Sequence, residues 1–282
     1  MDGRLWGGVR ASSHSGLART LFGRQGRGVD RWFLIIATAL AAVGGVAGMW
    51  SVHKGVRSRW TVIWMIAAFG AQIGFLSVRG EARGACPLIG LGEILAFLAW
   101  SLTFFYLAVG PAYRISLLGV FTAPVVVIFQ SVALLPGQLM ANPPRVPGTD
   151  PWHETHAAMS VLSYGALALA AVAGVMFLVL DRQLKDHHLQ SGLFRNLPPV
   201  RELLMSMVRL LWLGVALLSI GVFAGFMMPR QGGTAHLIAA CVVWASYVGF
   251  LAIKQVRGLT GRRTATVAVL LFVLSLSVFA LV

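Results

Sequence analysis

The stretch HAAMSVLSYGALALAAVAGVMFLVL, residues 156–180, decides the fold. It holds no Asp, Glu, Lys or Arg and is long enough to cross a lipid bilayer as one helix. The rest of the chain is similar, because 57% of its 282 residues are hydrophobic and only 11% are charged. An average soluble domain has about 25% charged residues. The sequence therefore predicts a membrane protein that crosses the bilayer several times.

Further apolar runs of similar length lie on both sides of this stretch. The predicted spans are residues 32–50, 60–78, 88–109, 115–135, 156–180, 208–228, 236–253 and 264–282. Tryptophans stand at the boundaries of the first two spans, as is typical of the membrane interface. The connections leave no room for a soluble domain. We therefore expect an all-α, polytopic bundle of about eight transmembrane helices over residues 32–282.

The basic residues predict the orientation of this bundle. Connections after odd-numbered spans hold thirteen Lys and Arg residues, counting Arg209 at the edge of the sixth span, and those after even-numbered spans hold four. Because cytoplasmic loops carry the excess of positive charge, this bias predicts that both termini lie outside. We expect the membrane to be the bacterial inner membrane. Basic loops beside helix ends bind anionic lipid, so the net charge of +14 requires no nucleic-acid partner.

Residues 1–31 do not fit this orientation. They contain six arginines, are rich in Gly and Ser and show no hydrophobic period, which predicts a basic, disordered tail. Arginines resist transfer to the outside, and two explanations are open. Either the start codon is assigned too far upstream and translation begins near Val29, or a genuine tail is held inside by a rearranged first span.

Two histidines open spans on the predicted outer face. His156 begins the fifth span and His236 begins the seventh. Two facing neutral imidazoles can bind a metal or both axial positions of a heme iron. The alternative is that each histidine is a solvated helix end. His153 lies three residues before His156, but nothing elsewhere in the sequence completes a metal site.

Other polar residues allow a similar choice between function and structure. Glu93 lies in the third span, where a carboxylate is costly unless it faces the bundle and has a partner. It could anchor a cofactor, or it could lock helix packing through a pair. Cys86 and Cys241 belong to no CxxC or CxxCH motif, so neither thiol exchange nor covalent heme attachment is expected. We expect no enzyme activity, because no catalytic constellation is evident.

Four stretches of the sequence point to one known family. In WHETHAAMSVLSYGAL (152–167), an outer histidine opens a span that carries Tyr164 two turns further in. In EILAFLAW (93–100), a Glu and a downstream Trp share a span and are followed by Tyr106. The other two are LPPVRE (197–202), in the connection between the fifth and sixth spans, and GLTGRRTA (258–265), in the turn before the last span. These stretches resemble the cytochrome c assembly family, which includes the CcsA/ResC and CcmC heme-handling proteins and their HemX/YpjD-type relatives, and LPPVRE is similar to the HemX/YpjD connection.

The resemblance implies a heme-binding bundle that takes part in cytochrome c maturation, with other maturation proteins as its partners. His156 and His236 would be the axial ligands of the heme iron. The remaining residues of the implied site are Glu93 nearby, and Trp100 and Tyr164 lining it. The alternative is a non-catalytic HemX/YpjD-like accessory protein that binds no heme.

The departures from the family indicate the branch. Heme-transporting members carry a WGxxWxWD loop before the penultimate span, whereas residues 229–235 read PRQGGTA. The sequence also ends at Val282 without the histidine that follows the last span in those members. The chain is therefore most similar to the HemX/YpjD-like branch that lacks the WWD motif, and the resemblance does not extend to heme export.

Overall fold

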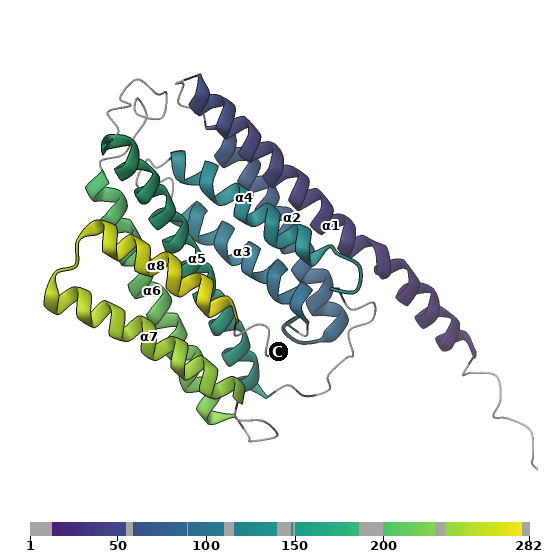
Figure 1. The fold of residues 1–282 in the computed structure, drawn as a ribbon. Coiled ribbons are helices and arrows are strands. Elements are labelled where there is room, and N and C mark those ends of the chain that lie inside the picture. Colours follow the sequence, from purple (N-terminus) through teal and green to yellow (C-terminus); the bar gives the residue numbers. More distant parts are fainter. Residues whose placement is uncertain are drawn as a thin grey trace, which may run out of the picture.

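Helices make up nearly all of the chain that can be described. The computed structural model describes residues 13–54, 59–88, 90–109, 116–139, 148, 150–185, 200–228 and 235–277, and it has no strand within these ranges. The described helices are α1 (Ser13–His53), α2 (Trp60–Arg83), α3 (Leu91–Val109), α4 (Ser116–Ala133), α5 (Pro151–Lys185), α6 (Val200–Met227), α7 (Ala235–Arg257) and α8 (Gly261–Ser275). The predicted all-α bundle is confirmed (Figure 1).

The helices differ in whether they can cross a bilayer completely. Six described helices are long and apolar enough to do so: α1, α2, α3, α5, α6 and α7. Helix α4 is a shorter apolar helix over Leu117–Ala133, and α8 has 15 residues. A full span needs about 20 residues. The end of the predicted last span, residues 278–282, lies outside the described residues. The chain is a multi-pass membrane protein.

Helix α1 begins earlier than the predicted first span. It starts at Ser13, so residues 13–31, which we expected to be disordered, continue the helix. Asp30 is buried within the bundle. The prediction was wrong here because it relied on a hydrophobic period, whereas the residue that ties this segment to the bundle is charged. A helix that is already formed also extends at little further cost. Residues 1–12 lie outside the described part of the chain.

Local sequence signals explain where two helices begin and end. Helix α5 begins at Pro151, whose missing N–H and fixed φ suit the first helical position. The preceding Asp150 caps it, because the Trp152 N–H donates to Asp150 Oδ1 at 3.2 Å. Helix α2 ends at Gly84, which takes a φ of 73° that favours glycine and donates its N–H to the Gly80 carbonyl.

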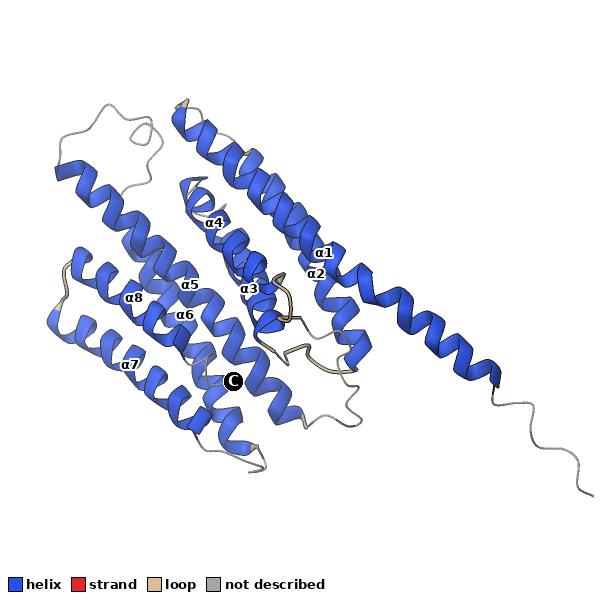
Figure 2. Cartoon of the chain, turned by 45° about the vertical axis from the view of Figure 1, so that its right-hand side comes forward, coloured by secondary structure: helices blue, strands red, loops and turns tan. Residues whose placement is uncertain are grey.

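Helix α5 lies at the centre of the bundle. It is the most buried of the candidate spans, and it packs against α3, α6 and α8. Helices α1–α4 lie on one side of it and α6–α8 on the other (Figure 2). Small residues make these approaches possible. A Cβ on Gly165 would collide with Ser101 of α3, and one on Gly214 of α6 would lie 2.6 Å from Leu167.

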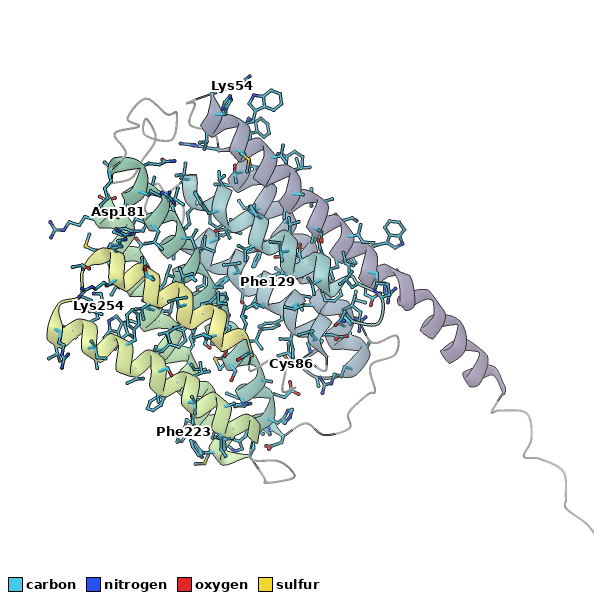
Figure 3. All side chains as sticks on the ribbon, viewed as in Figure 1. Lys54, Cys86, Phe129, Asp181, Phe223 and Lys254 are labelled. Carbon is cyan, nitrogen blue, oxygen red and sulfur yellow. The ribbon has the colours of Figure 1, made fainter. Side chains whose placement is uncertain are left out.

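The chain alternates between the two ends of the bundle. Lys54, Asp181 and Lys254 lie at one end, and Cys86 and Phe223 lie at the opposite end (Figure 3). The first group belongs to connections that the charge bias predicts to be cytoplasmic. Helix α5 begins at the second end, because Glu154 bonds to Cys86. The predicted outer histidine His156 therefore lies at the end opposite the basic loops.

Candidate functional site

His156 is held in a fixed orientation between α5 and α6. Its side chain is 8% exposed, and its Nδ1 lies 2.7 Å from the carbonyl oxygen of Gly221. A carbonyl oxygen can only accept a hydrogen bond, so Nδ1 carries the proton in this contact. In the neutral ring the lone pair then lies on Nε2, and the backbone acceptor fixes the direction in which it points.

Two glycines of α6 allow α5 to approach closely: Gly225 makes room for the His156 ring, and Gly221 lies against Ser160. Gly221 and Gly225 lie four residues apart and therefore on one face of the helix. A Cβ added to Gly225 would lie 2.8 Å from His156 Nδ1 and 3.0 Å from Leu237 Cδ1. The His156 ring, the α6 backbone and the first turn of α7 therefore meet at one place. We did not predict these glycines, although their four-residue spacing is a known signal of close helix approach.

His236 lies in the first turn of α7, directly before Leu237. Its side chain is outside the described part of the structure, so its predicted role stays a prediction. What the structure shows is the placement of its helix. The first turn of α7 lies against the same α6 glycine that the His156 ring contacts. The two predicted ligands thus lie near the starts of α5 and α7, and both helices contact Gly225 of α6 at this end of the bundle.

Tyr164 lies deeper in the bundle than His156. It is buried, and its hydroxyl donates to the carbonyl oxygen of Ser275 in α8 at 3.2 Å. Ser163 beside it bonds within α5 to the Ser160 carbonyl. Tyr164 therefore connects α5 to α8 about two turns below His156.

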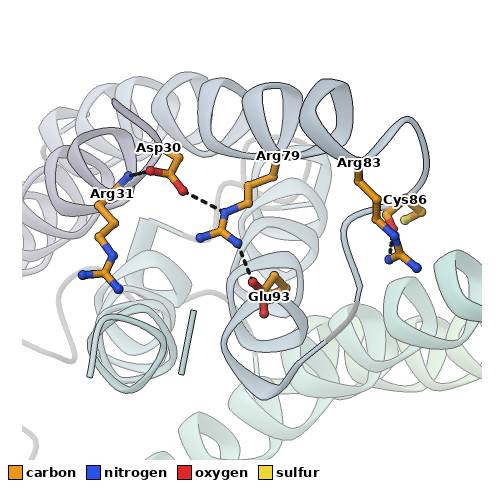
Figure 4. Close-up of polar contacts among 6 residues, drawn as sticks. All are labelled: Asp30, Arg31, Arg79, Arg83, Cys86 and Glu93. Carbon is orange, nitrogen blue, oxygen red and sulfur yellow. Dashed lines mark hydrogen bonds and ion pairs between the residues drawn. The ribbon is translucent and has the colours of Figure 1, made fainter. Parts of the chain in front are cut away.

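Glu93 has a charged partner that we did not predict. Arg79 of α2 donates from Nη1 to Glu93 Oε1 at 2.6 Å and from Nε to Asp30 Oδ2 of α1 at 2.8 Å (Figure 4). Arg79 is 4% exposed and Glu93 1%. We call these three residues the ion triad. This pairing agrees with the reading of Glu93 as a lock between helices. The sequence did contain a signal for this pair, because Arg79 and Glu93 carry opposite charges and lie on either side of the short connection between α2 and α3.

Trp100 faces a different neighbour from the one expected. Its ring stacks on Phe69 of α2 at a centroid distance of 5.9 Å and on Phe104 at 6.0 Å, and Phe97 lies against it at 5.1 Å. These contacts place Trp100 in an aromatic cluster on the α2–α3 side. His156 instead contacts α6. The structure therefore brings the start of α7 close to His156, leaves Tyr164 about two turns away on the same helix, and places Trp100 elsewhere.

The connection between α2 and α3 is pinned to the start of α5. Glu154 Oε2 accepts from the Cys86 N–H at 2.7 Å, and Arg83 Nη1 donates to the Cys86 carbonyl at 2.6 Å. Burial, and to a lesser degree the Glu154 carboxylate, raises the pKa of the Cys86 thiol to about 11. Within the described residues, no group of three or more His, Cys, Asp or Glu side chains could hold a metal ion.

Cys86 is therefore expected to react slowly with alkylating agents. Only the thiolate reacts, and a pKa of about 11 instead of the ordinary 9.0 leaves about a hundredfold less thiolate at pH 8. In a Cys241→Ser background, the rate of iodoacetamide labelling should rise about tenfold per pH unit until pH 11. The control is a cysteine at exposed Glu81, in a chain without Cys86, whose rate should level off near pH 9. Equal rates at pH 8 would contradict the raised pKa.

These features define the chain as an all-helical, multi-pass membrane protein with a buried, oriented histidine at one end of its bundle. The sequence model of the family described as "Cytochrome C assembly protein" matches residues 88–281, from the start of α3 onward. This match covers well over half of the chain. The chain belongs to the cytochrome c assembly protein family.

Curated relatives give the same result. The chain is 26% identical over 258 residues to the "Cytochrome c biogenesis protein CcsA" of Gloeobacter violaceus, a match that covers 71% of this chain and 76% of that protein. For the CcsA of a Synechococcus strain the identity is 27% over 269 residues, with 83% and 88% covered. For the CcsA of Nostoc punctiforme it is 34% over 128 residues, with 43% and 36% covered.

Proposed function

We propose that this chain is an integral membrane component of cytochrome c biogenesis that binds heme at the end of the bundle where α5 begins. The family membership and the CcsA relatives support the role in biogenesis. The observation that carries the heme site is the bond from His156 Nδ1 to the Gly221 carbonyl. We propose that the chain acts by binding and holding heme and is not itself an enzyme.

The chemistry of His156 fits a ligand of heme iron. Heme iron takes a neutral imidazole nitrogen, and a ligating histidine usually donates its other ring N–H to a carboxylate or a backbone carbonyl. The Gly221 carbonyl fills this second role for His156. His236 would offer the second imidazole from the adjacent first turn of α7. Bound heme would supply a redox-active iron, and the work of these residues is to hold and orient it.

The other predicted site residues take supporting roles in this proposal. Tyr164 would hold α5 against α8 below the heme through its bond to Ser275. Glu93 would act indirectly, because its bond to Arg79 holds α3 against α2, and Arg79 also bonds to Asp30 of α1. Trp100 would stabilise the contact between α2 and α3 through its stacking on Phe69.

We also propose that this site lies on the outer side of a bacterial inner membrane, with both termini outside. Support comes from the basic residues: Lys54 and Lys254 lie at the end of the bundle opposite the α5 start (Figure 3). Lysine-rich and arginine-rich loops remain cytoplasmic. Cytochrome c maturation proteins on the outer side would be the partners, together with the surrounding lipid.

A complementation experiment tests the proposed function. Deletion of the gene in its own bacterium should lower the amount of heme-stained c-type cytochromes, and the wild-type gene should restore it. His156→Ala and His236→Ala should fail to restore it at equal protein levels, whereas His153→Ala, an exposed neighbour, should succeed. Full rescue by both site variants would support an accessory protein that binds no heme. Unchanged cytochromes after deletion would contradict any role in biogenesis.

A further inference from the structure

A layer of buried amide groups crosses the α1–α4 half of the bundle, away from His156. Gln72 of α2 and Gln130 of α4 are 1% and 0% exposed. Gln72 Nε2 donates to Thr103 Oγ1 of α3 at 3.3 Å, and Thr103 in turn donates to the Ala99 carbonyl. Three amide atoms have no hydrogen-bond partner in the structure: Gln72 Oε1, Gln130 Oε1 and Gln130 Nε2.

The two glutamines lie at similar depths. Gly45 of α1 lies against Ala123 of α4, and the two helices are antiparallel. Counting seven residues forward along α4 and seven residues back along α1 places Gln130 level with Thr38. Gly74 of α2 lies against Phe33 of α1, and by the same counting Gln72 comes level with residue 35. The offset is about three residues, which is on the order of 4.5 Å along a helix axis and within the reach of two glutamine side chains.

Apolar layers close this region on both sides. Toward the ion triad lies a buried cluster that includes Leu34, Phe75, Ala96 and Ala133. Toward the opposite end lie the buried side chains of Met65, Ala68 and Leu102. These layers separate the glutamines from the ion triad and from the opposite end of the bundle. Apolar surroundings of this kind favour a small, neutral occupant.

An amide in such surroundings strongly favours a hydrogen-bond partner. Glutamine offers two donors and two acceptors, and polar groups left unsatisfied in an apolar interior destabilise the fold. A buried water molecule makes about three hydrogen bonds and can serve donors and acceptors at once.

We propose that the α1–α4 half of the bundle is a binding site for resident water, held between Gln130 and Gln72. The water accepts from the Gln130 amide nitrogen and donates to the amide oxygens of both side chains. It thereby connects α2 to α4, two helices that have only a narrow direct contact. Gln72 lies before residue 88, where the family match begins, and Gln130 lies within the match.

A double-mutant cycle tests this proposal on the full chain in lipid bicelles. Gln72→Leu and Gln130→Leu should each lower the melting temperature, and the double variant should lower it by less than the sum, because both side chains bind the same water. Thr122→Val is the matched control, since the buried Thr122 hydroxyl bonds only to Leu118 of its own helix, and its effect should add to that of Gln130→Leu. A single variant that raises the melting temperature, or additive glutamine effects, would overturn the proposal.

A second measurement is made on the wild-type protein and uses a variant only to assign the signal. Solid-state NMR in bilayers should show magnetisation transfer from water to the side-chain NH₂ of Gln130, at a signal that Gln130→Met removes. The side-chain NH₂ of Gln72, whose nitrogen already bonds to Thr103, should show weaker transfer. A Gln130 signal without any transfer from water would overturn the proposal.

Discussion

Arg79→Met is expected to destabilise the bundle by about 3–5 kcal/mol, which is typical for the loss of one partner from a buried ion pair. The guanidinium of Arg79 lies between Asp30 and Glu93, which are both buried. Its removal leaves two carboxylates close together in an apolar region, where each is costly and they repel each other. Thermal unfolding in detergent, followed by circular dichroism, should show a large fall in melting temperature.

Two further variants separate charge from packing in this prediction. A triple variant with Arg79→Met, Asp30→Asn and Glu93→Gln removes all three charges and should recover much of the lost stability. Glu81→Gln on the exposed side of the same helix should have little effect. The ion triad does not stabilise the bundle if Arg79→Met has the melting temperature of the wild type, or if the triple variant melts no higher than Arg79→Met alone.

Gly225→Val is expected to reduce heme binding by roughly tenfold while the chain remains folded, on the usual cost of overpacking of about 1–3 kcal/mol. A Cβ at this position would lie 2.8 Å from His156 Nδ1, so the imidazole must move. This movement breaks the hydrogen bond from Nδ1 to the Gly221 carbonyl, so Nε2 no longer points in its native direction. Titration of purified protein with heme, read by its absorbance, measures the change in affinity.

Gly249→Val is the matched control for this change. Gly249 lies in α7, and a Cβ there would meet nothing within 4 Å. This variant has the same change in side chain and should bind heme as the wild type does. Equal heme affinity in both variants would show that the position of the His156 ring does not control binding, and would contradict the proposed site.

The sequence predicted the helices better than it predicted their neighbours. Long apolar runs are a local property, so the start of α5 near His156 and the all-α fold followed directly from them. Asp30 was missed because a single charged residue leaves no hydrophobic period. The partner of Glu93 depends on which helices are adjacent, and an apolar run carries no information on that choice.

Trp100 is a second residue whose neighbours could not be predicted from the sequence. Its place in the third span was correct, but helical periodicity defines only which residues share a face. Whether that face meets α2 or α5 is decided by packing around Gly165 and Ser101, which brings the opposite side of α3 against α5. The Gly221 carbonyl that orients His156 is a backbone group, and no side-chain pattern reports its position.

The visible spectrum of the protein purified from heme-replete cells tests the proposed heme site most directly. The account predicts a Soret band in the wild type and in His153→Ala, and its loss in both His156→Ala and His236→Ala. Comparison at equal protein concentration, after confirming the fold by circular dichroism, excludes simple unfolding. A colourless wild-type protein, or a Soret band that survives both substitutions, would contradict the account.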